Sequence, residues 1–254
     1  MLPRLIAVLV LLGAAMATPA AAQSRFDGWA VAVVAGDWRG QGQPIQAFDN
    51  ARRDLVQGFL AAGFSRDALV DYSLRPDVPN PTTAQQALAG IADVTNRNTK
   101  GCLLYFTSHG SPAGIVFGPD ITLAPVDMAR LVRGWCGERP TVIVVSACFS
   151  GVFKEALSGP NRIVMTAASR VTSSFGCGAD AEYPYFDGCV LESLPGAADF
   201  ITLAHTTRAC VVRRETEENL TPPSDPQLFV GANMQLMAPT LRFNRPYAGG
   251  RPGS

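Results

Sequence analysis

Histidine is scarce in this chain: 254 residues include two, His109 and His205, and charged residues make up 17% of the composition. No two close pairs of Cys, His, Asp or Glu occur at the spacing of a structural zinc site, so no metal and no other cofactor is expected. No internal repeat is present either. Whatever chemistry the chain performs is therefore expected to come from its own side chains.

An excess of positive charge is also missing. The sequence has 21 basic and 21 acidic residues. Such a balance gives no electrostatic footprint for nucleic acid or for an anionic membrane surface. We therefore expect no nucleic-acid partner, and a partner would be recognised by shape and local polarity.

A long hydrophobic run occurs at the N-terminus, but it is too short to span a membrane. It extends from Leu5 to Ala17, whereas a spanning helix needs roughly 20 residues. Arg4 precedes it, and the small residues of 19–22 fit a signal-peptidase site. We expect residues 1–22 to be a cleaved signal peptide and the protein to be exported, to the periplasm or outside the cell; a retained anchor is the alternative. No cysteine lies there for lipid attachment.

The remaining chain is long enough for one α/β domain, which we expect at residues 23–241. Residues 242–254 turn to Arg, Pro and Gly, and we expect a loose tail. Apolar strand-like runs alternate with helical spacing, which indicates a mainly parallel sheet with helices on both faces. The oligomeric state is not predicted. Six strands are expected: four at 28–36, 68–72, 162–167 and 227–231, and two that begin at Cys102 and Thr141 and lead into His109 and Cys148.

Two of these apolar runs end in side chains that can do chemistry. The run from Thr141 leads into Cys148, and the run from Cys102 leads into His109. The segment between them holds a loop and one helix, as a right-handed crossover between parallel strands requires. Because ligands bind at the carboxyl ends of such strands, we expect His109 and Cys148 to lie side by side. A thiol beside an imidazole is the minimal equipment of a cysteine hydrolase.

Simpler interpretations exist for both residues. A cysteine at a strand end is often an inert hydrophobic residue, and a histidine there can merely bond a backbone carbonyl. His205 lies in a segment of helical spacing far from either run, and we expect it to have a surface or packing role.

The surrounding residues carry a resemblance. The segments Tyr105–Phe117 and Val145–Gly151, with Met165–Ser169 and Ser173–Cys177 after them, are similar to the signatures of the legumain-like cysteine peptidases of the caspase-like clan. The resemblance implies a three-layer α/β/α caspase-like fold and hydrolysis of a peptide bond through a thioester.

The same resemblance assigns further roles. Gly110 and Cys148 would supply the backbone N–H donors of an oxyanion hole. Ser174 and Asp187 match residues that line the pocket for the substrate residue before the scissile bond, and Ser146 stands where legumains have an acidic pocket residue. The long segment 169–188 is expected to be a loop that forms a wall of this cleft.

The chain departs from the legumain pattern at this pocket. Ser146 carries no charge, and the stretch Gln43 to Asn50 contains no arginine. A pocket without both charges is not expected to hold asparagine by the legumain contacts. The sequence also leaves open a transpeptidase or transamidase that uses the same thioester, and a catalytically silent peptide-binding module.

Six cysteines in an exported protein suggest disulfides. Cys102 and Cys136 form the first candidate pair, because they flank neighbouring strands. Two of Cys177, Cys189 and Cys210 could form another, and full reduction of all six is the alternative.

Overall fold

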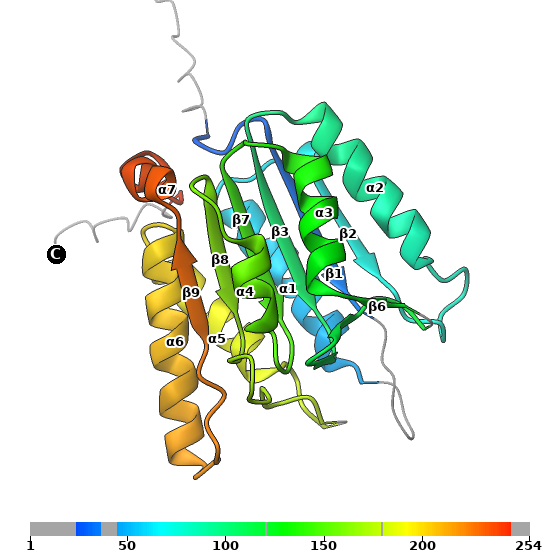
Figure 1. Ribbon diagram of the computed structural model, residues 1–254, viewed down its shortest axis with the longest axis vertical. Helices are drawn as coiled ribbons and strands as arrows, with labels where there is room; N and C mark the ends of the chain where they lie inside the picture. The colour runs from blue at the N-terminus through cyan, green and yellow to red at the C-terminus, as the bar shows by residue number, and fades with distance from the viewer. Residues whose placement is uncertain (1–23, 37–44, 120, 179, 245–254) are drawn as a thin grey trace, which may run out of the picture.

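The computed structural model describes residues 24–36, 45–119, 121–178 and 180–244. The predicted signal peptide, the residues Gln43 and Pro44 of the arginine-free stretch, and positions 245–254 of the predicted tail lie outside them. A six-stranded sheet forms the centre, with strand order β2-β1-β3-β7-β8-β9 (Figure 1). Its strands are β1 (Trp29–Ala35), β2 (Leu69–Ser73), β3 (Gly101–Thr107), β7 (Thr141–Ser146), β8 (Arg162–Thr166) and β9 (Gln227–Val230).

The expected mainly parallel sheet is confirmed. Five strands run parallel, and β9 pairs with β8 in the antiparallel direction. Every residue of β1, β3, β7 and β8 is buried. This explains why these strands read as continuous apolar runs rather than as alternating patterns, since helices cover both faces of the sheet.

The helices form two layers. On one face, β1, β3, β7 and β8 pack in one core cluster with α1 (Ala47–Ala61), α5 (Tyr185–Ser193) and α6 (Phe200–Glu217). On the other face they pack with α2 (Ala84–Arg97), α3 (Pro125–Cys136) and α4 (Val152–Leu157). A short helix, α7 (Ala232–Met237), follows β9. The chain is therefore an α/β/α sandwich (Figure 1).

Two regions differ from the sequence-based expectation. Between β3 and α3 the chain adds a small antiparallel sheet of β4 (Gly110–Ser111), β5 (Gly114–Val116) and β6 (Thr122–Leu123). The predicted loop at 169–188 is wrong at its end, because α5 begins at Tyr185. Gly188 weakened the helical pattern of this segment in the sequence. The residue lies where α5 packs on α6, and a Cβ added to it would be 3.3 Å from the Arg214 guanidinium.

The packed core extends past the predicted boundary at Arg242. Phe243 is 6% exposed, and its ring lies 4.8 Å from that of Phe200 on α6. The next residue, Asn244, donates its backbone N–H to Ala62 at 2.9 Å. Among the residues described, no helix combines the length and apolar character that crossing a membrane requires.

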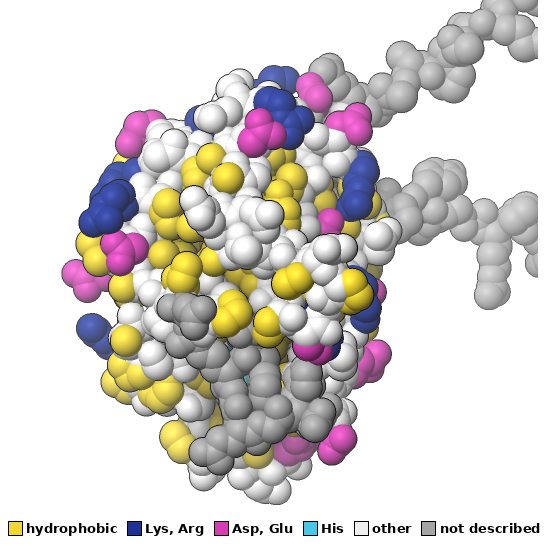
Figure 2. Space-filling model, turned by 90° about the vertical axis from the view of Figure 1, so that its right-hand side faces the viewer, with side chains coloured by type: hydrophobic (Ala, Val, Ile, Leu, Met, Phe, Trp, Pro, Cys, Tyr) yellow, Lys and Arg dark blue, Asp and Glu magenta, His cyan; other side chains and the backbone are white. Residues whose placement is uncertain are grey.

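The charged side chains are mixed on the face of the molecule that Figure 2 shows. Basic and acidic side chains lie close to one another near the rim of this face, and hydrophobic side chains lie toward its middle. The described residues therefore form no large area of a single charge on this face, in keeping with the balanced composition.

Each helical layer contains one helix or helix pair that is held by a disulfide. Cys102–Cys136 joins β3 to the end of α3, which confirms the first candidate pair. Cys189–Cys210 joins α5 to α6, which is one of the alternatives left open by the sequence. Cys148 and Cys177 are free.

Candidate active site

The ends of β3 and β7 bring His109 and Cys148 to the same edge of the sheet. The two strands are parallel neighbours with Thr107 opposite Ser146, and the pairing continues as Ser108 donates its N–H to the Ser146 carbonyl at 3.0 Å. His109 and Cys148 each follow two residues after the last registered pair. They therefore occupy equivalent positions on adjacent strand ends.

The turns that follow the two strands touch each other through backbone. A Cβ placed on Gly110 would lie 2.2 Å from the carbonyl oxygen of Cys148 and 2.9 Å from the Ala147 Cβ. Real Cβ contacts do not come this close, so the position accepts only glycine without movement of a neighbour. The missing side chain lets the histidine turn approach the cysteine turn.

Cys148 is half-buried, and its sulfur has several polar neighbours. Its Sγ lies 3.6 Å from both the carbonyl oxygen and the hydroxyl oxygen of Ser174. A hydrogen bond from the Cys177 thiol has the largest effect on this sulfur. Together with contacts to Ser174 and Ser173 it outweighs burial and lowers the pKa of Cys148 to about 5. The thiolate, which is the nucleophilic form of cysteine, is therefore favoured in neutral solution.

Cys177 has the opposite character. Its hydrogen bond to Cys148, reinforced by burial, raises its pKa well above the usual value. Of the two adjacent free cysteines, one is therefore a thiolate and the other a thiol donor. No pattern in the sequence pointed to this role, which left Cys177 as a disulfide candidate.

His109 is shielded by an aromatic neighbour. The ring of Phe48, at the start of α1, lies 4.9 Å from the imidazole in an edge-on arrangement. Burial lowers the pKa of His109. Its Nε2 is buried and makes no hydrogen bond within the described part of the chain, so no described protein group holds this nitrogen.

Phe48 packs near both His109 and Cys177. It belongs to a small apolar cluster with Ala35, Ile45 and Ala47, against which Cys177 packs. The sequence did not single out Phe48, because it read simply as an apolar position of a helix.

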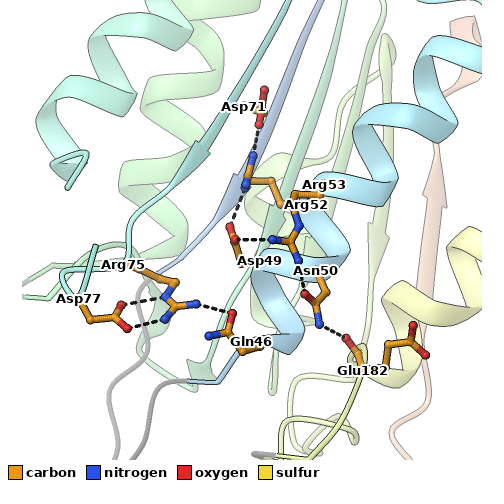
Figure 3. A network of polar contacts seen from close by, with 9 residues as sticks. All are labelled: Gln46, Asp49, Asn50, Arg52, Arg53, Asp71, Arg75, Asp77 and Glu182. Carbon is orange, nitrogen blue, oxygen red and sulfur yellow. Dashed lines mark hydrogen bonds and ion pairs between the residues drawn. The ribbon is translucent and has the colours of Figure 1, made fainter. Parts of the chain in front are cut away.

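A polar network holds this end of α1 in place (Figure 3). Arg52 donates to Asp49 at 2.8 Å and also bonds Asp71 of β2. On the other side, the Asn50 side chain donates to the Glu182 carbonyl at 3.0 Å. The network thus ties α1 both to the edge of the sheet and to the segment before α5, which contains Ser174 and Cys177.

The predicted pocket residues separate into two groups. Ser174 contacts the Cys148 sulfur directly. Ser146 and Asp187 instead lie beneath the site, with exposures of 2% and 0%. Asp187 is on α5 rather than in a loop. Its Oδ1 accepts from Tyr105 at 2.5 Å and its Oδ2 accepts from Thr107.

Tyr105 and Thr107 were not singled out from the sequence. They are two residues apart on β3, so they face the same side of the sheet, and a tyrosine and a threonine on one face of a buried strand signal a polar partner. Burial is the largest influence on the Asp187 carboxyl and raises its pKa to about 6, although hydrogen bonds from Thr107, Tyr105 and Ser146 oppose it.

This raised pKa predicts a dependence of stability on pH. The folded protein holds the Asp187 proton up to about pH 6, against 3.8 for the free side chain. Its contribution is therefore largest below pH 3.8 and is lost as pH rises toward 6, on the order of 3 kcal/mol in free energy of unfolding. Asp187→Asn should remove this loss. Urea unfolding of both proteins at several pH values between 4 and 7 measures it, and equal pH dependence in the two would contradict the assignment.

Two further points concern the second histidine and metal binding. His205 is exposed on α6, in the surface position expected for it. Within the described ranges, no three His, Cys, Asp or Glu side chains gather in a way that could hold a metal ion.

Comparison with known proteins agrees with this geometry. Residues 83–193 match the model of the Peptidase C13 family. The match includes β3, β7 and both candidate catalytic residues. A comparison with curated proteins gives no match.

Among solved structures, the chain is similar to the crystal structure of caspase-1 from Spodoptera frugiperda. The TM-score is 0.60 at 10% sequence identity, over 88% of this chain and 94% of that one. At 10% identity, the similarity shows a shared fold and gives no information on function. Over residues 83–193, which hold His109 and Cys148, the chain is therefore similar to the Peptidase C13 family, and its architecture is that of a caspase-like fold.

Proposed function

We propose that this protein is a cysteine endopeptidase that cleaves peptide bonds through a thioester on Cys148, with His109 as general acid and base. The observation that carries the proposal is the free Cys148, with a pKa lowered to about 5, on the strand end adjacent to that of His109. Strongly perturbed groups at such an edge are typical of catalytic sites.

The mechanism follows from these two groups. The Cys148 thiolate attacks the carbonyl carbon of the scissile bond. His109, which must first take up a proton because burial lowers its pKa, gives that proton to the leaving amine. Water then attacks the thioester and gives a proton to His109, which releases the acid product and restores the thiolate. The backbone N–H groups of Gly110 and Cys148 are the candidate donors to the oxyanion.

Ser174 is the candidate pocket residue with direct access to the nucleophile. Its contact with Cys148 supports a place beside the substrate residue before the scissile bond. Ser146 and Asp187 are buried beneath the site, so in this proposal they support the pocket and do not touch the substrate. We further propose export to an oxidising compartment, which the two disulfides support.

The proposal is tested with a peptide library and with a peptide-like, thiol-reactive probe. Wild type should cleave the library and be labelled at Cys148, and Cys148→Ala should do neither. His109→Ala should lower turnover by about 100-fold or more, the usual contribution of general acid–base catalysis. His205→Ala provides the matched control, because it removes the exposed histidine of α6 and should leave turnover unchanged.

Two results would contradict this function. One is labelling of Cys148 no faster than that of Cys177. The other is a His109→Ala variant that is as active as His205→Ala.

A further inference from the structure

The turn that carries Cys148 contains a residue with positive φ and is hydrogen-bonded to a neighbouring loop. Phe149 has a φ of 57°, which is uncommon for a bulky residue. Its N–H donates to the Thr172 carbonyl at 2.9 Å, and the Ser150 hydroxyl accepts from the Ala168 N–H at 3.1 Å. A Cβ on Gly151 would come within 2.4 Å of the Arg170 nitrogen. The position of Cys148 is therefore set by the loop 167–172, which follows β8.

That loop is held in turn by Ser224, in the segment between α6 and β9. The Ser224 carbonyl accepts from the Ser169 N–H at 2.8 Å and from the Thr172 hydroxyl at 2.6 Å. Thr172 therefore bonds the nucleophile turn through its backbone and Ser224 through its side chain. Ser224 is 1% exposed, so water does not compete for these bonds.

Ser224 is fixed by a buried carboxylate on α6. Glu215 Oε1 accepts from the Ser224 N–H at 3.0 Å and also from its hydroxyl. Glu215 is 2% exposed, and its Oε2 has no hydrogen-bond partner among the described residues. Burying a carboxylate with one oxygen unpaired is costly. An apolar side chain would fill the same space without this cost, so the contact to Ser224 needs a reason.

We propose that Glu215 is a positioning residue for the nucleophile, acting through Ser224 and Thr172 on the Cys148 turn. The inference rests on the proposed function of Cys148. The relay also bears on the environment of the thiolate, because the segment that begins with Thr172 goes on to Ser173, Ser174 and Cys177. Releasing Ser224 frees this segment, so the donors that stabilise the thiolate move away from the sulfur.

The test measures the rate of Cys148 alkylation by iodoacetamide against pH, read by mass spectrometry. In Glu215→Met, which has similar volume and no acceptor oxygen, the pH midpoint should rise by at least one unit, so that labelling below the midpoint falls at least ten-fold. Glu215→Gln keeps an acceptor oxygen and should behave as wild type. Cys177 is the titratable group that acts on the thiol, Asp187 acts on Cys177 in turn, and His109 follows the adjacent strand. All variants retain these three groups.

A control separates positioning from general stability. Asp199 caps the opposite end of α6 by accepting from the Thr202 N–H at 2.8 Å. Asp199→Ala should lower the melting temperature, because loss of a cap costs about 1 kcal/mol, and should leave the midpoint unchanged. A role of Glu215 in stability alone would give the same pattern as Asp199→Ala.

Thr172 tests the same relay if Glu215→Met does not fold. Thr172→Val loses the hydroxyl that bonds Ser224 and should raise the midpoint, whereas Thr172→Ser keeps it and should not. An unchanged midpoint in the folded Met and Val variants overturns the positioning role while the proposed function stands. Failure of wild-type Cys148 to be labelled ahead of Cys177 overturns both.

Discussion

Gly110→Ala is expected to lower turnover of a peptide substrate by about 100-fold or more while the protein remains folded. The added Cβ would lie 2.2 Å from the Cys148 carbonyl oxygen, so one of the two turns must move by about 1 Å. A displacement of this size between reacting groups costs about two orders of magnitude in rate. The same shift would misplace the Gly110 N–H, a candidate donor to the oxyanion.

The matched control is Gly134→Ala. Gly134 lies on α3, and a Cβ added there would meet no atom within 4 Å. Alanine should therefore leave turnover unchanged and stabilise the helix by about 1 kcal/mol. Steady-state kinetics and melting temperatures of the three proteins decide the matter. Full activity in Gly110→Ala would mean that the close contact of the two turns is not needed for catalysis.

Cys177→Ala is expected to raise the pKa of Cys148. The Cys177 thiol is the largest single influence that holds this pKa at about 5. Without it, the thiolate forms at higher pH, because the remaining serine contacts must alone oppose burial. A rise of one unit or more lowers the thiolate fraction below the midpoint at least ten-fold, and each unit corresponds to about 1.4 kcal/mol.

Cys177→Ser separates the loss of a donor from the loss of volume. Serine keeps a hydroxyl that can donate to the thiolate, so its midpoint for Cys148 alkylation should stay closer to wild type than that of the alanine variant. If alanine and serine give the wild-type midpoint, Cys177 does not stabilise the thiolate.

The central sheet and the positions of His109 and Cys148 on adjacent strand ends could be predicted because their signals are local and strong. Strands buried on both faces are continuous apolar runs, and His109 and Cys148 follow two of them directly. The length of the crossover between these strands predicted that they are parallel neighbours, as the structure shows. The disulfide Cys102–Cys136 followed from the same arrangement.

The surroundings of Cys148 could not be predicted, because they depend on how irregular segments fold. Cys177 reaches Cys148 through a loop with no periodic pattern, and Glu215 acts through two other residues. Asp187 was found by resemblance, but its burial on α5 was not, since Gly188 weakened the helical signal. In each case the deciding contact joins segments distant in the chain.

The two disulfides make the folded state depend on the redox conditions around the protein. They close segments with sequence separations of 34 and 21 residues, and bridges of this span each contribute roughly 3 to 4 kcal/mol by limiting the unfolded chain. Their sum is comparable with the whole stability of an ordinary domain, about 5 to 15 kcal/mol. One bridge ties α3 to the sheet and the other ties α5 to α6 within the opposite layer, so a reducing agent would loosen the packing on both sides of the sheet. The same reagent that keeps the Cys148 thiol available for reaction would thus weaken the framework that positions it.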